Sequence, residues 1–263
     1  TQGQSLDEVK NLMLGEIEHL KKGEFDDALL TSIINNAKKA LMEQNEKYGS
    51  RAYALMSIFT SEDDWRDNVA YADRLSKLTK KDIIDFANKY FGNNYVVVYK
   101  RKGEDKSITK VPKPPITAVE TNRDAQSQFV KSVINAPTEA IKPVWVDYTK
   151  DFQRGFIGPA EILYVHNSDN DLFRMSYRYK TGKWNDRRLA VAAQYLQFLG
   201  TDTKSAEDIS KEFYKLACSF NVRTDNEYTT VQLEGLQENF DKAVTLLEDL
   251  LANCRADEAA LAS

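Results

Sequence analysis

The stretch RRLAVAAQYLQFLGT, residues 187–201, decides how the rest of this sequence is read. Its apolar residues recur at the spacing of one helical face, which predicts an amphipathic helix packed on a strand hairpin that precedes it. Gly200 predicts the end of this helix, because glycine readily adopts the backbone conformation found just past a helix terminus. The apolar face consists of Leu189, Ala192, Ala193, Leu196 and Leu199.

Length and composition favour a two-domain protein that does not bind nucleic acid. The chain has 263 residues, of which 42% are hydrophobic and 29% charged, and its formal net charge is -4. A nucleic-acid binder usually shows a basic excess. No apolar run approaches the roughly 18 residues that a membrane-spanning helix needs. The chain begins at Thr1 without a methionine, so we expect a piece of a longer protein.

Cysteine and histidine are too few and too scattered to predict a metal site. Cys218 and Cys254 each lie in an apolar helical pattern, which favours buried free thiols, although spacing alone leaves a disulfide open. His19 lies near a helix end and His166 in a turn, so dipole stabilisation and solvation explain them. The acidic pair Glu207–Asp208 falls at a helix start, where capping explains it.

Residues 1–101 read as helices followed by a strand. Ser5 and Glu8 form a capping-box pattern before the first helix, and Thr79 and Asp82 do so before the last. The strand is expected at 94–101, NYVVVYKR, because this run is β-branched and aromatic. A lone strand leaves backbone groups unpaired, so its partners should lie outside this segment. The helices are expected at 6–20, 26–45, 48–59, 64–75 and 80–91.

Residues 102–152 read as an interdomain linker, and residues 153–263 as a second domain. The linker contains five of the six prolines, which disfavour helix and central strand. In the second domain, strands 161–165 and 172–179 should form a hairpin around HNSDND, and 221–224 and 228–236 a second hairpin. Helices are expected at 187–201, 206–220 and 240–251. This order predicts an α+β fold with helices on one side of an antiparallel sheet.

The order of these elements resembles the insulinase/pitrilysin zinc metallopeptidases. Three segments carry the resemblance. They are ILYVHNSDNDLFRMSYRYKTGKW, the helix ending FLGT, and NVRTDNEYTTVQLEGLQENFDKAVTLLEDLL. Residues 6–100 resemble the end of a preceding domain in such a protein. The resemblance implies two incomplete αβ sandwich domains joined by an extended linker, the second of them a degenerate, inactive half.

The chemistry departs from the family pattern at three positions. If Gly200–Thr201 aligns with the family's Gly-Thr pair, its His-x-x-Glu-His motif falls on Val191, Gln194 and Tyr195. A catalytic zinc of this type needs two imidazoles, a carboxylate and a general base. Valine offers no lone pair, neutral glutamine is no useful base, and tyrosine is a poor ligand at neutral pH. We therefore expect neither a catalytic nor a metal-binding residue in this chain.

The resemblance implies a role as a non-catalytic portion of a zinc metalloendopeptidase. Zinc would belong to the catalytic half of the parent protein, and the partners would be the remaining domains and an unfolded peptide substrate. A wholly inactive scaffold or assembly subunit of the same fold is the main alternative, and an unrelated helical α+β interaction protein is the other. The sequence does not identify the substrate-binding residues. Only the resemblance suggests a bacterial periplasm or cell envelope.

Overall fold

The structure is a computed structural model that describes residues 3–103, 107, 109 and 111–262. It divides into two units, one made of residues 1–96 with 167–263 and the other of residues 97–166. Helices and antiparallel strands coexist, so the α+β class predicted from the sequence is confirmed. Among the described residues, no helix is both long and apolar enough to cross a bilayer.

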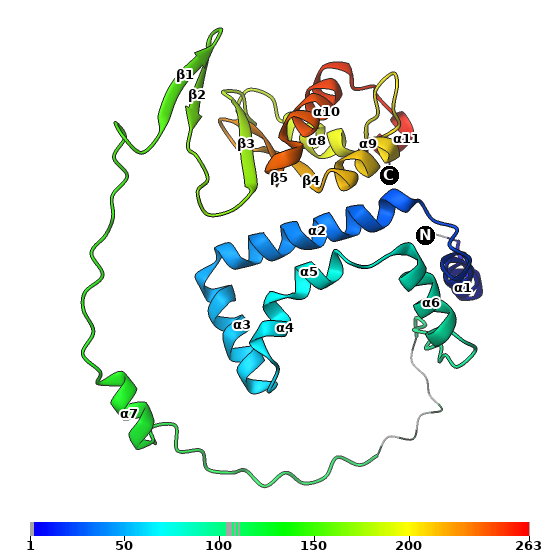
Figure 1. Ribbon diagram of the computed structural model, residues 1–263, viewed down its shortest axis with the longest axis vertical. Coiled ribbons are helices and arrows are strands. Elements are labelled where there is room, and N and C mark those ends of the chain that lie inside the picture. Colours follow the sequence, from blue (N-terminus) through cyan, green and yellow to red (C-terminus); the bar gives the residue numbers. More distant parts are fainter. Residues whose placement is uncertain (1–2, 104–106, 108, 110, 263) are drawn as a thin grey trace. The chain divides into compact units, whose positions relative to one another are not determined.

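Six helices make up the first part of the chain (Figure 1). The capping boxes at Ser5 and Thr79 are both present, and Gly23 ends the first helix with a φ of 74°. The segment 64–75 is two short helices rather than one, because the helix breaks at Ala70. The six helices are α1 (Leu6–Lys22), α2 (Asp27–Glu46), α3 (Tyr48–Thr60), α4 (Trp65–Val69), α5 (Tyr71–Leu75) and α6 (Lys80–Tyr90).

The predicted strand at 94–101 is wrong. This segment belongs to no helix or strand, and Val96 and Val98 are 90% and 88% exposed. The described residues supply it with no strand partner, and a strand without a partner leaves its backbone groups unpaired. Local β propensity therefore does not decide the structure of this segment.

The described residues of the unit 97–166 form one short helix and one hairpin. Helix α7 (Gln128–Ile134) lies within the proline-rich segment, whose other described residues before 153 form no helix or strand. Strands β1 (Gln153–Ile157) and β2 (Ala160–Tyr164) then pair with each other, with Ile157 opposite Ala160. The sequence analysis predicted only the second of these strands.

A three-stranded antiparallel sheet, in the order β3-β5-β4, is the centre of the second part of the chain. Its strands are β3 (Leu172–Tyr179), β4 (Cys218–Thr224) and β5 (Thr229–Leu236). The predicted hairpin of 221–224 with 228–236 is confirmed by the β4–β5 pairing. The predicted hairpin of 161–165 with 172–179 is wrong, because β3 pairs with β5, with Leu172 opposite Leu236. The predicted packing of the helix at 187–201 on that hairpin is also wrong, because the helix packs on β4, which follows it in sequence.

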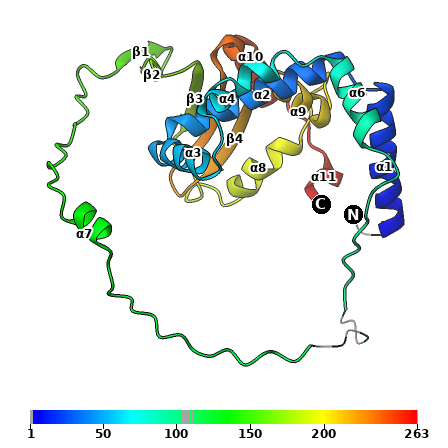
Figure 2. The same ribbon diagram turned by 60° about the horizontal axis from the view of Figure 1, so that its bottom comes forward.

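Three helices accompany the sheet, and a fourth follows them (Figure 2). They are α8 (Leu189–Tyr195), extended by a 3₁₀ turn at Leu196–Phe198, then α9 (Ala206–Lys215), α10 (Phe240–Asn253) and α11 (Glu258–Ala262). The core lies between the sheet and helices α9 and α10. It contains Phe173, Ile209, Phe213, Cys218, Val231, Leu233, Ala243, Leu246, Leu247 and Leu250.

Helix α9 is shorter than the predicted helix 206–220, and Ala217 gives the reason. Ala217 has a φ of 48°, a left-handed conformation that interrupts a right-handed helix. The backbone turns there, and β4 begins at the next residue, Cys218. Ala217 is fully buried, so the surrounding structure holds this turn in place.

Candidate functional site

Helix α8 carries the three positions at which the family resemblance would place a zinc motif. Val191 is 57% exposed, Gln194 is exposed, and Tyr195 is half-buried. Ala192 is also exposed, so the buried face of the helix is narrower than the sequence predicts. Neither an imidazole nor a carboxylate stands at these three positions, and their chemistry does not fit a zinc ion.

Tyr195 connects α8 to the segment just before α11. Its hydroxyl lies 2.5 Å from both the carbonyl oxygen and the amide nitrogen of Asp257. Close by, the Arg255 amide donates to the Gly200 carbonyl at 2.9 Å, and the Arg255 guanidinium pairs with Asp202. The second histidine of a zinc motif would thus fall on Tyr195, whose hydroxyl instead forms hydrogen bonds with the Asp257 backbone.

Gly200 follows this helix for a steric reason. A Cβ at this position would lie 2.5 Å from the Lys204 carbonyl oxygen, a distance that a side chain cannot occupy. The tight loop that results is closed by a bond from the Thr201 amide to the same Lys204 carbonyl at 2.8 Å. This loop places Ser205 at the start of α9, where its side chain and that of Asp208 form a capping box.

Potential metal ligands do not gather elsewhere in the described ranges. No group of three or more His, Cys, Asp and Glu side chains is found within 3–103, 107, 109 and 111–262. His19 lies 3.7 Å from Glu16 and 3.8 Å from Glu24 on an exposed surface. His166 lies beside the hydroxyl of Tyr164 at 3.4 Å. Glu207 pairs with Lys211 at 2.6 Å, so both residues of the acidic pair have structural partners.

The two cysteines are free, and they differ in environment. Cys218 is buried and Cys254 is exposed, so the expectation of two buried thiols is wrong for Cys254. Burial raises the pKa of the Cys218 thiol to about 11. A thiol must ionise to act as a nucleophile, so Cys218 is unreactive at neutral pH.

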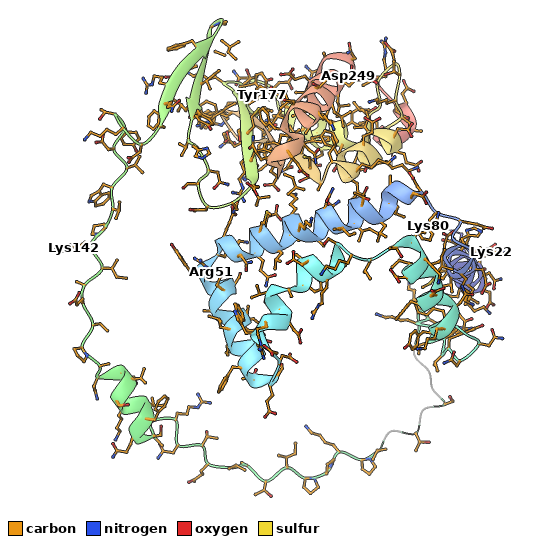
Figure 3. All side chains as sticks on the ribbon, viewed as in Figure 1. Lys22, Arg51, Lys80, Lys142, Tyr177 and Asp249 are labelled. Atoms are coloured by element: carbon orange, nitrogen blue, oxygen red, sulfur yellow. The ribbon has the colours of Figure 1, made fainter. Side chains whose placement is uncertain are left out.

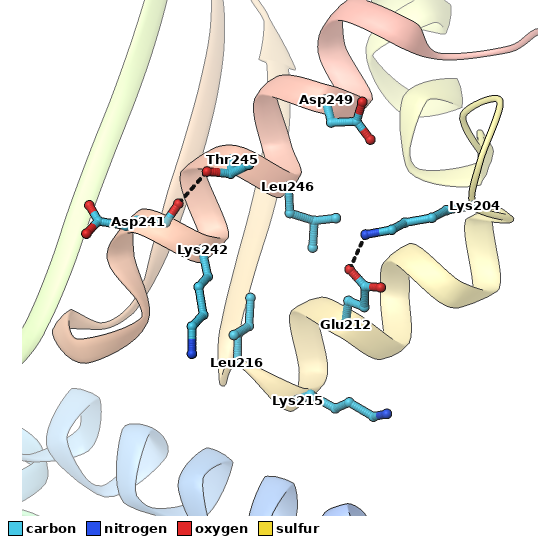
Figure 4. Close-up of a pocket in the computed structure, with 9 residues that line it drawn as sticks. All are labelled: Lys204, Glu212, Lys215, Leu216, Asp241, Lys242, Thr245, Leu246 and Asp249. Carbon is cyan, nitrogen blue, oxygen red and sulfur yellow. Dashed lines mark hydrogen bonds and ion pairs between the residues drawn. The ribbon is translucent and has the colours of Figure 1, made fainter.

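An open cleft of about 710 Å³ lies between α9 and α10, and the sequence analysis did not predict it (Figure 4). Leu216 and Leu246 give it an apolar floor, and Lys204 pairs with Glu212 at 2.6 Å on its rim. No polar side chain on its floor is buried without a hydrogen-bond partner in the part of the chain that is described. It is a surface groove between two amphipathic helices, and most of the side chains that line it are charged or polar.

Comparison with known proteins identifies the second part of the chain. The sequence model of the insulinase family (peptidase family M16) matches residues 190–263, which begin within α8. Residues 190–263 are thus similar in sequence to the insulinase family. An uncharacterized zinc protease of Rickettsia felis is 30% identical over 84 residues, which is 32% of this chain and 20% of that protein. Mitochondrial cytochrome b-c1 complex subunit 1 of Bos taurus is 28% identical over 81 residues, 31% of this chain and 16% of that protein.

Solved insulinase-family proteases are also similar to the chain. The periplasmic protease PqqL of Escherichia coli is 12% identical with a TM-score of 0.39, over 98% of this chain and 29% of that one. The ferredoxin protease FusC, solved in complex with Arabidopsis ferredoxin, is 11% identical with a TM-score of 0.38, over 92% of this chain and 30% of that one. The match therefore spans a fifth of the curated Rickettsia relative and less than a third of each of these proteases.

Proposed function

We propose that this insulinase-family segment is a non-catalytic portion of a zinc metalloendopeptidase. The observation that carries the proposal is the chemistry of α8. Val191 and Gln194 are unsuited to zinc, and the Tyr195 hydroxyl is occupied by the Asp257 backbone. Zinc, the expected cofactor of such a peptidase, would be held by another part of the parent protein.

The role left to the segment is to help enclose and hold an unfolded peptide. An extended peptide can add to the edge of a sheet through main-chain hydrogen bonds, and such binding tolerates many sequences. Strand β3 offers such an edge, because within the described residues it pairs with β5 alone. The segment 97–166 would join this part to the preceding half.

A metal and activity measurement tests the non-catalytic role. After dialysis, elemental mass spectrometry should find much less than one zinc ion per molecule of the purified chain. It should also fail to cleave a quenched fluorescent peptide. Stoichiometric zinc, or cleavage that survives repurification and is abolished by a chelator, would overturn the proposal.

A binding measurement tests the peptide-holding role. Fluorescence anisotropy should show saturable binding of a labelled, unstructured peptide of about 20 residues. The same peptide with every backbone nitrogen methylated is the matched control, because it has lost the N–H donors that strand addition requires. Equal binding of the two peptides would contradict recognition through the sheet edge.

The alternative is a scaffold or assembly subunit without peptidase activity. The similarity to a subunit of the cytochrome b-c1 complex favours this reading, because that protein is named as part of an assembly. The two candidates differ in the parent protein. A His-x-x-Glu-His helix elsewhere in it would support the peptidase, and the absence of such a helix would support the scaffold.

A further inference from the structure

Helix α2 presents a polar stripe to the αβ domain, which we define as residues 172–253. The stripe recurs every three or four residues and so occupies one face of the helix. It consists of Ser32, Asn36, Lys39, Glu43 and Glu46, of which Ser32 is buried and the others are half-buried. Figure 1 shows α2 alongside α9, and the two helices are in contact.

Polar contacts connect α2 and its N-cap residue to two elements of the αβ domain, α9 and β4. The Asn36 side-chain amide donates to the Tyr214 carbonyl at 2.8 Å, at the end of α9. The Lys39 ammonium lies 3.2 Å from the Ser219 hydroxyl on β4. At the amino end of α2, Asp26 lies 3.5 Å from the Lys215 ammonium.

The strongest contact of this interface is at the carboxyl end of α2. Two Arg174 guanidinium nitrogens donate to the two Glu46 carboxylate oxygens, at 3.1 and 2.6 Å. The Asn170 side chain also donates to Glu46 at 3.0 Å. Arg174 additionally lies 3.7 Å from Glu234. Side-chain hydrogen bonds from Arg174 and Asn170 lower the pKa of Glu46, so this carboxylate is ionised at neutral pH.

The apolar share of the interface is small. Met42 of α2 packs on a cluster made of Leu172, Ala217 and Leu236, and Met42 itself is only partly buried. The large core of the αβ domain excludes α2, because each of its members comes from residues 173–251. Interfaces of this kind, polar and connected by few apolar contacts, usually permit the parts to move relative to each other.

The covalent connection does not oppose such movement. Between α6 and β3 the chain passes through residues 97–166, which form a separate unit. Only one short helix and one two-stranded hairpin interrupt its otherwise irregular described backbone. The contact between α2 and the αβ domain must therefore be maintained by the interface itself.

We propose that the α2 interface is a charge-controlled latch, with the Glu46–Arg174 pair as its principal contact, that releases and rebinds the αβ domain. Ions in solution screen exposed charge pairs, so rising ionic strength weakens the latch. Charge on a bound or neighbouring molecule would act in the same way. This inference is independent of the proposed function, because it uses only contacts within this chain.

Distance measurements between two probes test the latch in the full chain. One probe is attached to the native Cys254, which is exposed, and the other to a cysteine that replaces the exposed Asn45 at the end of α2. Cys218 is buried and stays unlabelled. A rise in salt from about 50 to about 500 mM should increase the fraction of long distances by up to about fivefold, because an exposed pair contributes no more than that. Arg174→Glu should increase it by about five- to tenfold, because the reversed charge adds repulsion.

The charge swap separates a latch from a merely damaged fold. Glu46→Arg alone should open the interface, and Glu46→Arg combined with Arg174→Glu should restore the short distance. Lys81→Glu is the matched control, because Lys81 pairs with Asp85 on the exposed surface of α6 and should change nothing. The proposal would be overturned if the probe-to-probe distances change with neither salt nor Arg174→Glu. It would also be overturned if the double charge swap fails to restore the short distance.

Discussion

The Tyr195 hydroxyl and the Asp257 main chain meet at 2.5 Å, which joins α8 to the segment that precedes α11. The sequence separates these two residues by 62 positions. The contact explains why a tyrosine suits this position in a helix without metal chemistry. Its ring packs partly buried, and its hydroxyl satisfies backbone groups that begin the last helix.

Tyr195→Phe should lower the free energy of unfolding by about 1 kcal/mol, because a half-buried hydroxyl hydrogen bond is lost. Urea denaturation followed by circular dichroism measures the change. Tyr214→Phe is the control, since its documented bond uses the main-chain carbonyl, which the substitution retains. Equal losses of unfolding free energy in the two variants would show that the Tyr195–Asp257 contact does not stabilise the fold.

Ala217→Val should destabilise the protein by more than about 2 kcal/mol. A β-branched side chain is strongly disfavoured at a φ of 48°, and this position is fully buried. Ala217→Gly should stay within about 1 kcal/mol of the parent, because glycine adopts this conformation without strain. Thermal denaturation of both variants checks the contrast, and a valine variant as stable as the glycine variant would contradict the left-handed turn.

Gly235→Ala should cost about 1–3 kcal/mol, because the added methyl has no space. Its Cβ would lie 2.3 Å from the Cys218 sulfur and 2.8 Å from the Cys218 Cα. Combining it with Cys218→Ala should recover only part of the loss, since the backbone clash persists. Gly155→Ala, where no atom lies within 4 Å, provides the unaffected comparison in equilibrium unfolding.

Stability should fall as pH rises from about 9 to about 12. Burial raises the pKa of Cys218 from 9.0 to about 11, and burial with the Glu248 bond raises that of Tyr177 from 10.0 to about 12. Above the ordinary pKa of each group the unfolded state ionises while the folded state stays protonated, so folding loses free energy. Urea midpoints across this range measure the decline. It should flatten in Cys218→Ala combined with Tyr177→Phe, and an equally steep decline in that variant would refute the assignment.

The cysteines should also differ in reactivity. At pH 8 a disulfide reagent should modify one thiol per folded chain, at Cys254, because Cys218 is buried and its pKa is raised. Peptide mapping identifies the modified residue. Two equivalents reacting at the same rate without denaturant would show that Cys218 is accessible.

Local signals in the sequence determined where several helices of this protein begin. Ser5 with Glu8 and Thr79 with Asp82 predict helix starts that the structure confirms, because a capping box acts within four residues. The β4–β5 hairpin is equally local, since its turn spans only residues 225–228. The chemistry expected of α8 also follows from residue identity, because no neighbouring contact supplies Val191 with a lone pair.

The tertiary structure alone decided the strand partners and the roles of the side chains. β3 pairs with β5, whose paired residues lie 50 to 64 positions away, and the equally β-prone segment 94–101 pairs with no strand among the described residues. Arg174 meets Glu46, and Tyr195 meets Asp257, only because the fold brings them together. The reason is physical: helical hydrogen bonds close within four residues, whereas a strand or a charge pair is satisfied by groups that the local sequence does not specify.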